Sequence, residues 1–170
     1  MALPKKVKNF NFFVDGEGYA GRVAELTLPK LARKVEEFRA GGMSGPVDVD
    51  MGQEKLEAEA TFAEHAETVL KQYGAPGVDA IGMRFLGYAE SDTAGASHNA
   101  IEIVMRGRVK ELDFGSNKPG DDTAFKASFS LSYFKYTLNG ADLVEIDVIN
   151  MIEKVNGVDR LQEQRDALGV

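Results

Sequence analysis

The feature that most constrains the fold is a strict alternation of apolar and polar residues near the C-terminal end. Lys126, Ser128, Ser130 and Ser132 separate a series of apolar side chains, namely Phe125, Ala127, Phe129, Leu131 and Tyr133. A period of two is typical of a β-strand with one buried face, so residues 123–138 are predicted to form a strand. The Asn139-Gly140 dipeptide that follows favours a two-residue hairpin. We therefore expect the next segment to return antiparallel.

That next segment carries apolar residues on both faces of its predicted strand. Val144, Ile146 and Val148 alternate with Glu145 and Asp147, and Ile149 and Met151 then continue the acidic side. A strand whose two faces are both apolar would leave one of them exposed in an isolated domain. The sequence therefore predicts that this segment contacts another chain.

A helix is predicted over residues 157–168 at the C-terminal end. Asn156 is placed to cap its start and Gly169 to end it, and the helical spacing comes from Val158, Leu161, Arg165 and Leu168. A second helix is predicted over residues 62–74. It has capping-box spacing between Thr61 and Glu64, and its apolar stripe comprises Ala66, Val69, Leu70 and Tyr73.

The remaining alternation predicts strands at residues 10–14, 19–28, 55–62, 79–88 and 99–112. Asp15-Gly16 favours a hairpin between the first two of these. About eight strands, mostly joined by hairpins, favour a mainly β (α+β) fold. We expect an antiparallel β-sandwich or barrel with a flanking helix and a C-terminal helix, as one domain over residues 1–170.

Residues 27–52 do not fit this pattern. Leu28, Leu31, Val35 and Phe38 fall at helical spacing behind Pro29, which indicates a helix. Residues 40–52 are rich in glycine and predict a loop, yet they are unusually apolar through Met43, Val47, Val49 and Met51. These side chains either pack back on the core of their own subunit or are covered by an adjacent copy.

Composition limits the classes of function. The chain has 170 residues, a formal net charge of −7 and no cysteine, which excludes disulfides and thiolate sites. The acidic balance argues against non-specific binding of nucleic acid, and the absence of a long apolar run predicts no membrane anchor. Residues 1–8 form a short basic arm that we expect to be disordered in the monomer.

No catalytic, metal or cofactor site is predicted. Residues 16–21 satisfy GxGxxG, but a hairpin context in place of a helix argues against a dinucleotide site. His65 and His98 lack metal-ligand spacing. The basic stripe of Arg106, Arg108 and Lys110 is expected to pair with acidic neighbours and not with phosphate, so the chain is predicted not to be an enzyme.

Several long strings then identify a family resemblance. FNFFVDGEGYAG, LTLPKLARKVEEFRAGGM and DVDMG resemble the start of the major tail tube proteins of contractile-tailed bacteriophages, and LVEIDVINMIEKVNGVDRL resembles their C-terminus. The resemblance covers nearly the whole chain. The resemblance implies that residues 27–52 form a projecting hairpin and loop, with a strand in place of the helix that spacing indicates. We adopt this interpretation of the segment.

The resemblance also implies that six copies close into a ring, that rings stack into an inner tail tube, and that four strands of each copy join a ring-wide β-barrel. Such a barrel, with strands about 4.8 Å apart and tilted about 40°, has a circumference on the order of 150 Å, wide enough for duplex DNA. Implied partners are the tail sheath outside, the tape-measure protein and double-stranded DNA inside, and baseplate and tail-terminator proteins at the ends. Such a tube belongs to the virion and is assembled in the host cytoplasm.

Alternatives remain at this stage. A tube of a phage-derived bacteriocin or a type VI secretion-like apparatus has the same architecture without DNA. The other alternative is a monomeric ligand-binding sandwich that does not assemble. For the tube, our candidate inter-subunit contacts are Lys5, Phe38, Met43, Val47, Val49, Met51, Ile149, Met151, Ile152 and Val155. The candidate acidic residues facing the lumen, where they would repel DNA toward the axis, are Glu57, Glu59, Glu145 and Asp147.

Overall fold

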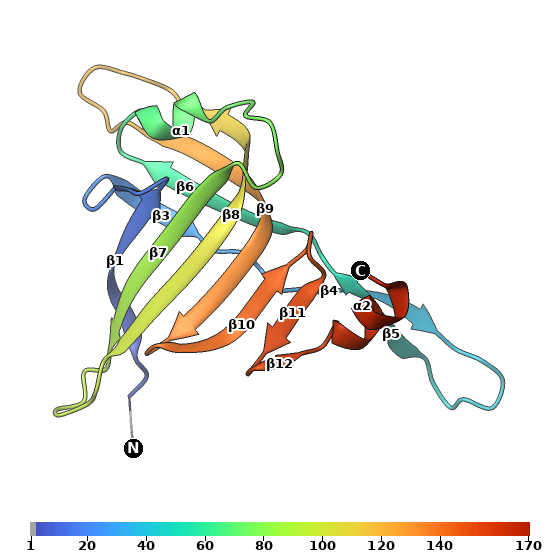
Figure 1. Cartoon of the computed structure of the whole chain (residues 1–170). Coiled ribbons are helices and arrows are strands. Elements are labelled where there is room, and N and C mark those ends of the chain that lie inside the picture. The colour runs from blue at the N-terminus through green and yellow to red at the C-terminus, as the bar shows by residue number, and fades with distance from the viewer. Residues whose placement is uncertain (1–2) are drawn as a thin grey trace.

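Long alternating strands form one strongly curved antiparallel sheet in the computed structural model, which describes residues 3–170 (Figure 1). The two helices are α1 (Glu67–Lys71) and α2 (Gln162–Leu168). The strands are β1 (Lys6–Val14), β2 (Glu17–Gly18), β3 (Val23–Thr27), β4 (Arg33–Phe38), β5 (Val47–Gln53), β6 (Leu56–Phe62), β7 (Ile81–Glu90), β8 (Asn99–Asp113), β9 (Phe125–Leu138), β10 (Ala141–Asp147), β11 (Ile152–Val155) and β12 (Val158–Asp159).

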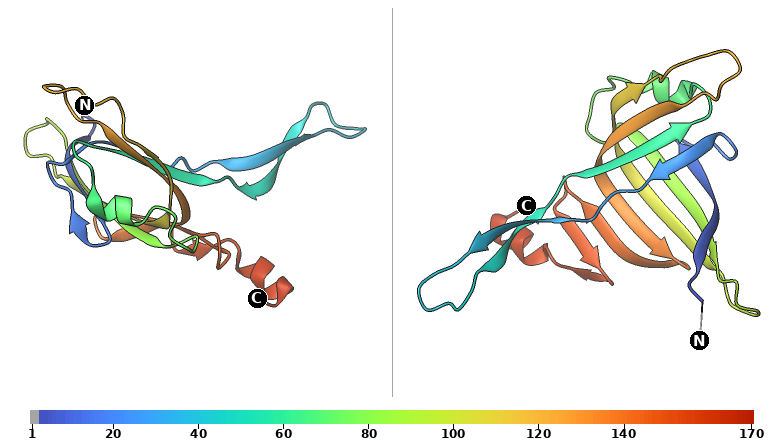
Figure 2. Two further views of the ribbon diagram at one scale, coloured as in Figure 1. Left: turned by 90° about the horizontal axis from the view of Figure 1, so that it is seen from above. Right: turned by 180° about the vertical axis from the view of Figure 1, so that it is seen from behind.

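The main sheet has the order β12-β11-β10-β9-β8-β7-β1-β2, and β6 and β3 form a second layer that crosses behind it (Figure 2). Strand β9 serves both layers, because residues 125–131 pair with β6 and residues 133–138 pair with β10. The core between the layers is apolar and fully buried at Phe12, Phe62, Phe125 and Phe129. The expected mainly β fold with antiparallel strands and two short helices is confirmed.

A β-bulge at Ser132 changes which residues of β9 face the core. Leu131 lies opposite Gly107 and Tyr133 lies opposite Arg106, so Ser132 is an extra residue on its strand. An extra residue reverses the alternation beyond it. Phe134 is therefore buried, whereas Tyr133 turns outward, where the Arg106 guanidinium lies 4.1 Å from its ring centroid. The prediction that Tyr133 shares the apolar face of Phe125 was wrong.

The hairpin after β1 also differs from the expected one. Asp15 and Gly16 have positive φ angles of 48° and 84°, as a two-residue turn of the primed type requires. The returning strand nevertheless stops after Gly18, and Tyr19 turns into the core. The chain then continues as β3, which pairs with β6. The single strand predicted over residues 19–28 is therefore two strands on different partners.

Both helices are shorter than predicted. Helix α1 has no side-chain cap, and the capping box of Thr61 and Glu64 does not form because β6 runs through Thr61 to Phe62. Residues 157–161 form β12 and a turn, because Asn156 adopts a positive φ of 51° and starts a tight turn with Gly157. Gly169 ends α2 in the left-handed conformation, as predicted.

The predicted single C-terminal strand is a hairpin. Strand β10 ends at Asp147, whose carboxylate accepts hydrogen bonds from the backbone N–H of Ile149 and of Asn150 at 3.1 and 3.0 Å. These bonds hold a turn, and β11 then returns along β10. The two apolar faces expected on one strand therefore belong to a strand, a turn and a second strand.

Strands β4 and β5 pair only with each other and project from the sheet, as Figure 2 shows; we call this hairpin, residues 33–53, the arm. Its first half is a strand, as the family resemblance implies, and not the helix indicated by spacing. Residues 47–53 are a strand as well, so the predicted loop is shorter than expected. None of the helices in residues 3–170 is long and apolar enough to cross a membrane.

Candidate functional site

One face of the arm carries exposed apolar side chains, with Glu36 as its acidic member opposite Val49. Phe38 lies directly opposite Val47, and Val49 lies two residues further along the same face. Their exposed fractions are 54%, 50% and 43%. The alternative that Val47, Val49 and Met51 pack back on the core of their own subunit is therefore wrong. A two-stranded ribbon is at best marginally stable alone, so this face has the properties of a contact surface.

The opposite face of the arm carries Glu37 and Asp48, which lie directly opposite each other, and also the exposed Val35. Met43 lies at the tip, where its sulfur accepts a hydrogen bond from the Ala40 N–H at 3.2 Å. Met51 lies at the other end of β5 and lines a hollow at the root of the arm. The apolar residues of the segment are thus distributed over one face, the tip and the root.

Arg33 connects the arm to the main sheet at this root. Its guanidinium lies 2.7 Å from the Asp50 carboxylate within the arm and 2.6 Å from the Glu153 carboxylate of β11. The bonds to Asp50 and Glu153 raise the pKa of Arg33, and the Arg33 guanidinium lowers the pKa of Asp50. No local pattern in the sequence indicates this contact, which joins residues 120 positions apart.

The C-terminal candidates divide between the surface and the root hollow. Ile149 is exposed in the turn after β10, beside the equally exposed Val148. Met151 and Ile152 are half-buried and line the hollow at the root of the arm. Val155 lies opposite Val144, whose side chain packs on the core.

The N-terminal candidate, Lys5, is held by the β7–β8 loop. Its amine donates to Ser97 Oγ at 3.0 Å and to Asn99 Oδ1 at 2.8 Å. Strand β1 already begins at Lys6, so the described part of the predicted basic arm is ordered; Met1 and Ala2 lie outside the described residues. The prediction of a disordered arm was therefore wrong from Leu3 onward.

The face of β7–β10 that points away from the core, which we call the outer sheet face, carries charges of both signs. Arg84 pairs with Glu102 at 2.7 Å, and Lys135 lies 3.8 Å from Asp142. Glu145 accepts a hydrogen bond from the Tyr133 hydroxyl at 2.9 Å. Burial, followed by the carboxylate of Glu145, raises the pKa of Tyr133 to about 12. Some charges on this face are thus paired, whereas Arg106 packs over the Tyr133 ring and forms no ion pair within residues 3–170.

Asp147 belongs to the same sheet face but is buried. Burial opposes its ionisation, yet the donors of Asn150 and Ile149 outweigh that effect, so its pKa lies below the ordinary value. The carboxylate accepts the hydrogen bonds that close the turn, from the Ile149 N–H and from the backbone and side-chain N–H groups of Asn150. Asp147 is therefore a structural acid in the subunit.

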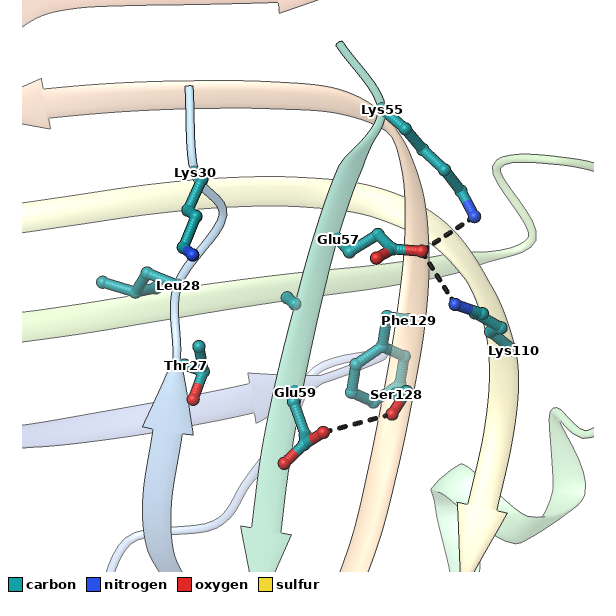
Figure 3. A pocket seen from close by; sticks show the side chains of 10 residues that line it. Thr27, Leu28, Lys30, Lys55, Glu57, Glu59, Lys110, Ser128 and Phe129 are labelled. Atoms are coloured by element: carbon teal, nitrogen blue, oxygen red, sulfur yellow. Dashed lines mark hydrogen bonds and ion pairs between the residues drawn. The ribbon is translucent and has the colours of Figure 1, made fainter. Parts of the chain in front are cut away.

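Glu57 and Glu59 lie on the opposite layer, along β6, where they line a hollow (Figure 3). Glu57 pairs with Lys55 at 2.8 Å and with Lys110 at 2.9 Å, and these two amines lower its pKa to about 2. Glu59 accepts a longer hydrogen bond from the Ser128 hydroxyl at 3.4 Å. The expected pairing with an acidic neighbour is confirmed for Lys110, whereas Arg106 and Arg108 form no ion pair within residues 3–170.

These positions divide the four acidic candidates for the lumen into two pairs. Glu57 and Glu59 lie opposite Ser130 and Ser128 in the first half of β9. Glu145 lies opposite Lys135 in the second half of that strand, so the two pairs occupy different parts of the curved sheet.

The histidines serve as packing groups. The ring of His65 contacts Phe114 and Phe125 at centroid distances of 5.6 and 5.7 Å, and His98 stacks on Tyr88 at 5.2 Å. Within residues 3–170, no group of three or more His, Cys, Asp or Glu side chains could hold a metal ion. Of the glycines of the GxGxxG string, Gly16 lies in the β1–β2 turn, Gly18 ends β2, and Gly21 lies in the connection to β3.

Comparison with known proteins identifies close sequence relatives. Residues 4–169 match the family model described as phage tail tube protein FII. The chain is 46% identical over 173 residues to the tail tube protein of Escherichia phage P2, with both proteins covered completely. It is 37% identical over 159 residues to the major tail tube protein of Serratia phage KSP20, covering 92% of this chain and 91% of that protein.

The fold is similar to solved structures at much lower identity. One is the PVC sheath–tube complex of an extracellular contractile injection system in the extended state, with a TM-score of 0.59 and 10% identity over 79% of this chain and 91% of that chain. The sheath/tube terminator structure of the same system has a TM-score of 0.58 and 10% identity, covering 79% of this chain and 96% of that chain. These likenesses concern the fold.

Proposed function

We infer the function of this chain from the premise that it belongs to the phage tail tube protein FII family. It is a structural protein of a phage tail tube and a component of the virion, and not an enzyme. The observation that carries this conclusion is the 46% sequence identity to a phage tail tube protein over the complete length of both proteins.

Six copies are proposed to close into a ring, and rings to stack into the tube. Strands β7–β10 are consecutive, antiparallel and long, with one face in the core and the other open, which suits the wall of a channel. Within residues 3–170, the main sheet ends in edges that are only briefly covered, since β2 pairs with two residues of β1 and β12 with two residues of β11. Neighbouring copies in a ring would protect these edges.

The arm is the proposed contact to a neighbouring copy. Its apolar face of Phe38, Val47 and Val49 is exposed in the subunit and would be buried on assembly. Further contacts are assigned to the arm tip and root, the turn after β10, the β11 strand and the N-terminal segment, through Met43, Met51, Ile149, Met151, Ile152, Val155 and Lys5.

The outer sheet face is the proposed wall of the channel, with Glu145 facing the lumen. Glu145 lies 3.8 Å from Lys154, and Arg84 has a carboxylate partner on the same face. A phosphate would have to displace these carboxylates in order to bind, so paired cations hold DNA less firmly than free ones. Glu57 and Glu59 belong to the opposite layer in this arrangement, and Asp147 remains a turn residue.

The tube is proposed to form inside a tail sheath and around the tape-measure protein and double-stranded DNA, between a baseplate and a tail terminator, with assembly in the host cytoplasm. Ejection of DNA through the channel is the corresponding role. A tube of a bacteriocin or a type VI secretion-like apparatus is less well supported, since both sequence relatives are phage proteins.

Negative-stain electron microscopy of the purified protein tests this assembly. We expect hollow tubes, or rings with six-fold symmetry in end-on views, at high protein concentration. Compact particles of the size of one chain at every concentration, in sedimentation as well as in micrographs, would overturn the proposal that this chain assembles by itself.

A further inference from the structure

The arm has few means of keeping its orientation on the subunit. It leaves the second layer after β3 and returns to it at β6, and its two strands pair only with each other. A hollow of about 680 Å³ separates its root from the C-terminal hairpin and α2, with Met51 on one side and Met151 and Leu161 on the other. Close packing at the root therefore cannot fix the angle at which the arm projects.

An ion pair bridges this joint. Arg33 is the first residue of β4, and its guanidinium reaches Glu153 at 2.6 Å while it also contacts Asp50 at 2.7 Å. Asp50 belongs to the arm itself, so that bond fixes the guanidinium relative to the arm. Glu153 belongs to β11 of the main sheet, so the second bond fixes the arm relative to the subunit.

The environment of Glu153 makes release of the arm costly. Glu153 is buried, with 8% of its surface exposed, and lies opposite Ile146 of the core. In the described part of the chain, Arg33 is the ion-pair partner recorded for its carboxylate. Swinging the arm away would leave a buried carboxylate without a counter-charge, which proteins tolerate poorly.

We propose that Arg33 is the positioning residue of the arm, and that its bond to Glu153 sets the orientation of the arm before subunits meet. This inference rests on the proposed function, because an arm held in its docking orientation loses less conformational freedom on assembly. Asp50 has a different role, because it orients the guanidinium within the arm and does not cross the joint.

Distance measurements between spin labels test the orientation directly. The chain has no cysteine, so Ser44→Cys at the arm tip and Lys126→Cys on β9 place a unique pair of labels. Spin-diluted subunits with the native Arg33 and Glu153 are expected to give one narrow distance distribution. Glu153→Gln removes the charge with little change of shape and is expected to broaden the distribution, as is Arg33→Gln.

Two control variants distinguish loss of the bond between Arg33 and Glu153 from loss of an ion pair elsewhere. Asp50→Asn keeps an acceptor for the Gly52 N–H and leaves the bond to Glu153, so the distribution is expected to stay narrow. Arg84→Gln removes an ion pair of similar length on the outer sheet face and is expected to leave the distribution unchanged. Circular dichroism confirms that each variant is folded, and Arg33→Gln decides the question if Glu153→Gln does not fold.

Assembly provides a second readout. Glu153→Gln and Arg33→Gln are expected to raise the concentration needed for tubes about tenfold, and Asp50→Asn to leave it nearly unchanged. A narrow, unshifted distance distribution in both joint variants would overturn the positioning role. Absence of tubes from the unaltered chain would instead contradict the proposed function, while the label distances would still decide the role of Arg33.

Discussion

Replacing Phe38, Val47 and Val49 together by serine is expected to suppress tube formation while the subunit stays folded. These residues share the exposed apolar face of the arm, and each is about half exposed. Full burial of such a side chain contributes about 1.5–3 kcal/mol, so burying the exposed half contributes roughly 1 kcal/mol. The triple variant therefore loses roughly 3 kcal/mol per contact, which corresponds to about a 100-fold higher concentration for assembly.

The assay is pelleting of tubes by ultracentrifugation over a range of protein concentrations, combined with thermal unfolding of the unassembled subunit. Exposed substitutions change stability by about 0.5 kcal/mol or less each, so the melting temperature should move little. A matched variant, Glu37→Ser with Asp48→Ser, changes the opposite face of the same ribbon and is expected to assemble much more readily. Pelleting of the triple variant at the concentration of the unaltered chain would refute the reasoning.

Three further predictions concern the subunit. Phe129→Ala, at a fully buried core position, is expected to lower the free energy of unfolding by about 3–5 kcal/mol in denaturant titrations, and a loss below about 1 kcal/mol would contradict the assigned core. Asp147→Ala removes the acceptor of the turn after β10 and is expected to cost about 2–3 kcal/mol by the same titration, whereas exposed Asp48→Ala should cost little. Glu57 has a pKa lowered from 4.5 to about 2, so its stabilising effect is complete above pH 4.5 and is lost between pH 4.5 and 2. Glu57→Gln should reduce the fall in the free energy of unfolding between pH 4.5 and 2. An unchanged fall would show that the pairing with Lys55 and Lys110 contributes nothing to stability.

Local patterns in the sequence predicted most of the strands. In β6, β8 and the first half of β9, buried and exposed side chains alternate, and apolar and polar residues alternate in the same way along the sequence. The Asn139-Gly140 turn was equally predictable, because both residues adopt the positive φ angles that this dipeptide favours.

Features that depend on distant partners were not predictable in the same way. The bulge at Ser132 arises from the register between β8 and β9. No local sequence pattern predicts that the side chain of Tyr133 turns outward. Strand β3 leaves the first hairpin because β6 offers it a partner. The contact between Arg33 and Glu153 joins segments far apart in the chain, and neither residue stands out in the sequence. The exposed face of the arm was anticipated as a contact surface, but its division between face, tip and root required the pairing of β4 with β5.

The double membership of β9 has a mechanical consequence. A pull on the arm reaches β9 through β6, and a pull on the C-terminal hairpin reaches the same strand through β10. Tension between the two therefore passes along the backbone of β9, which hydrogen bonds to β8 hold along nearly its whole length. A subunit pulled at its arm and at its C-terminal hairpin thus transmits the load through one strand.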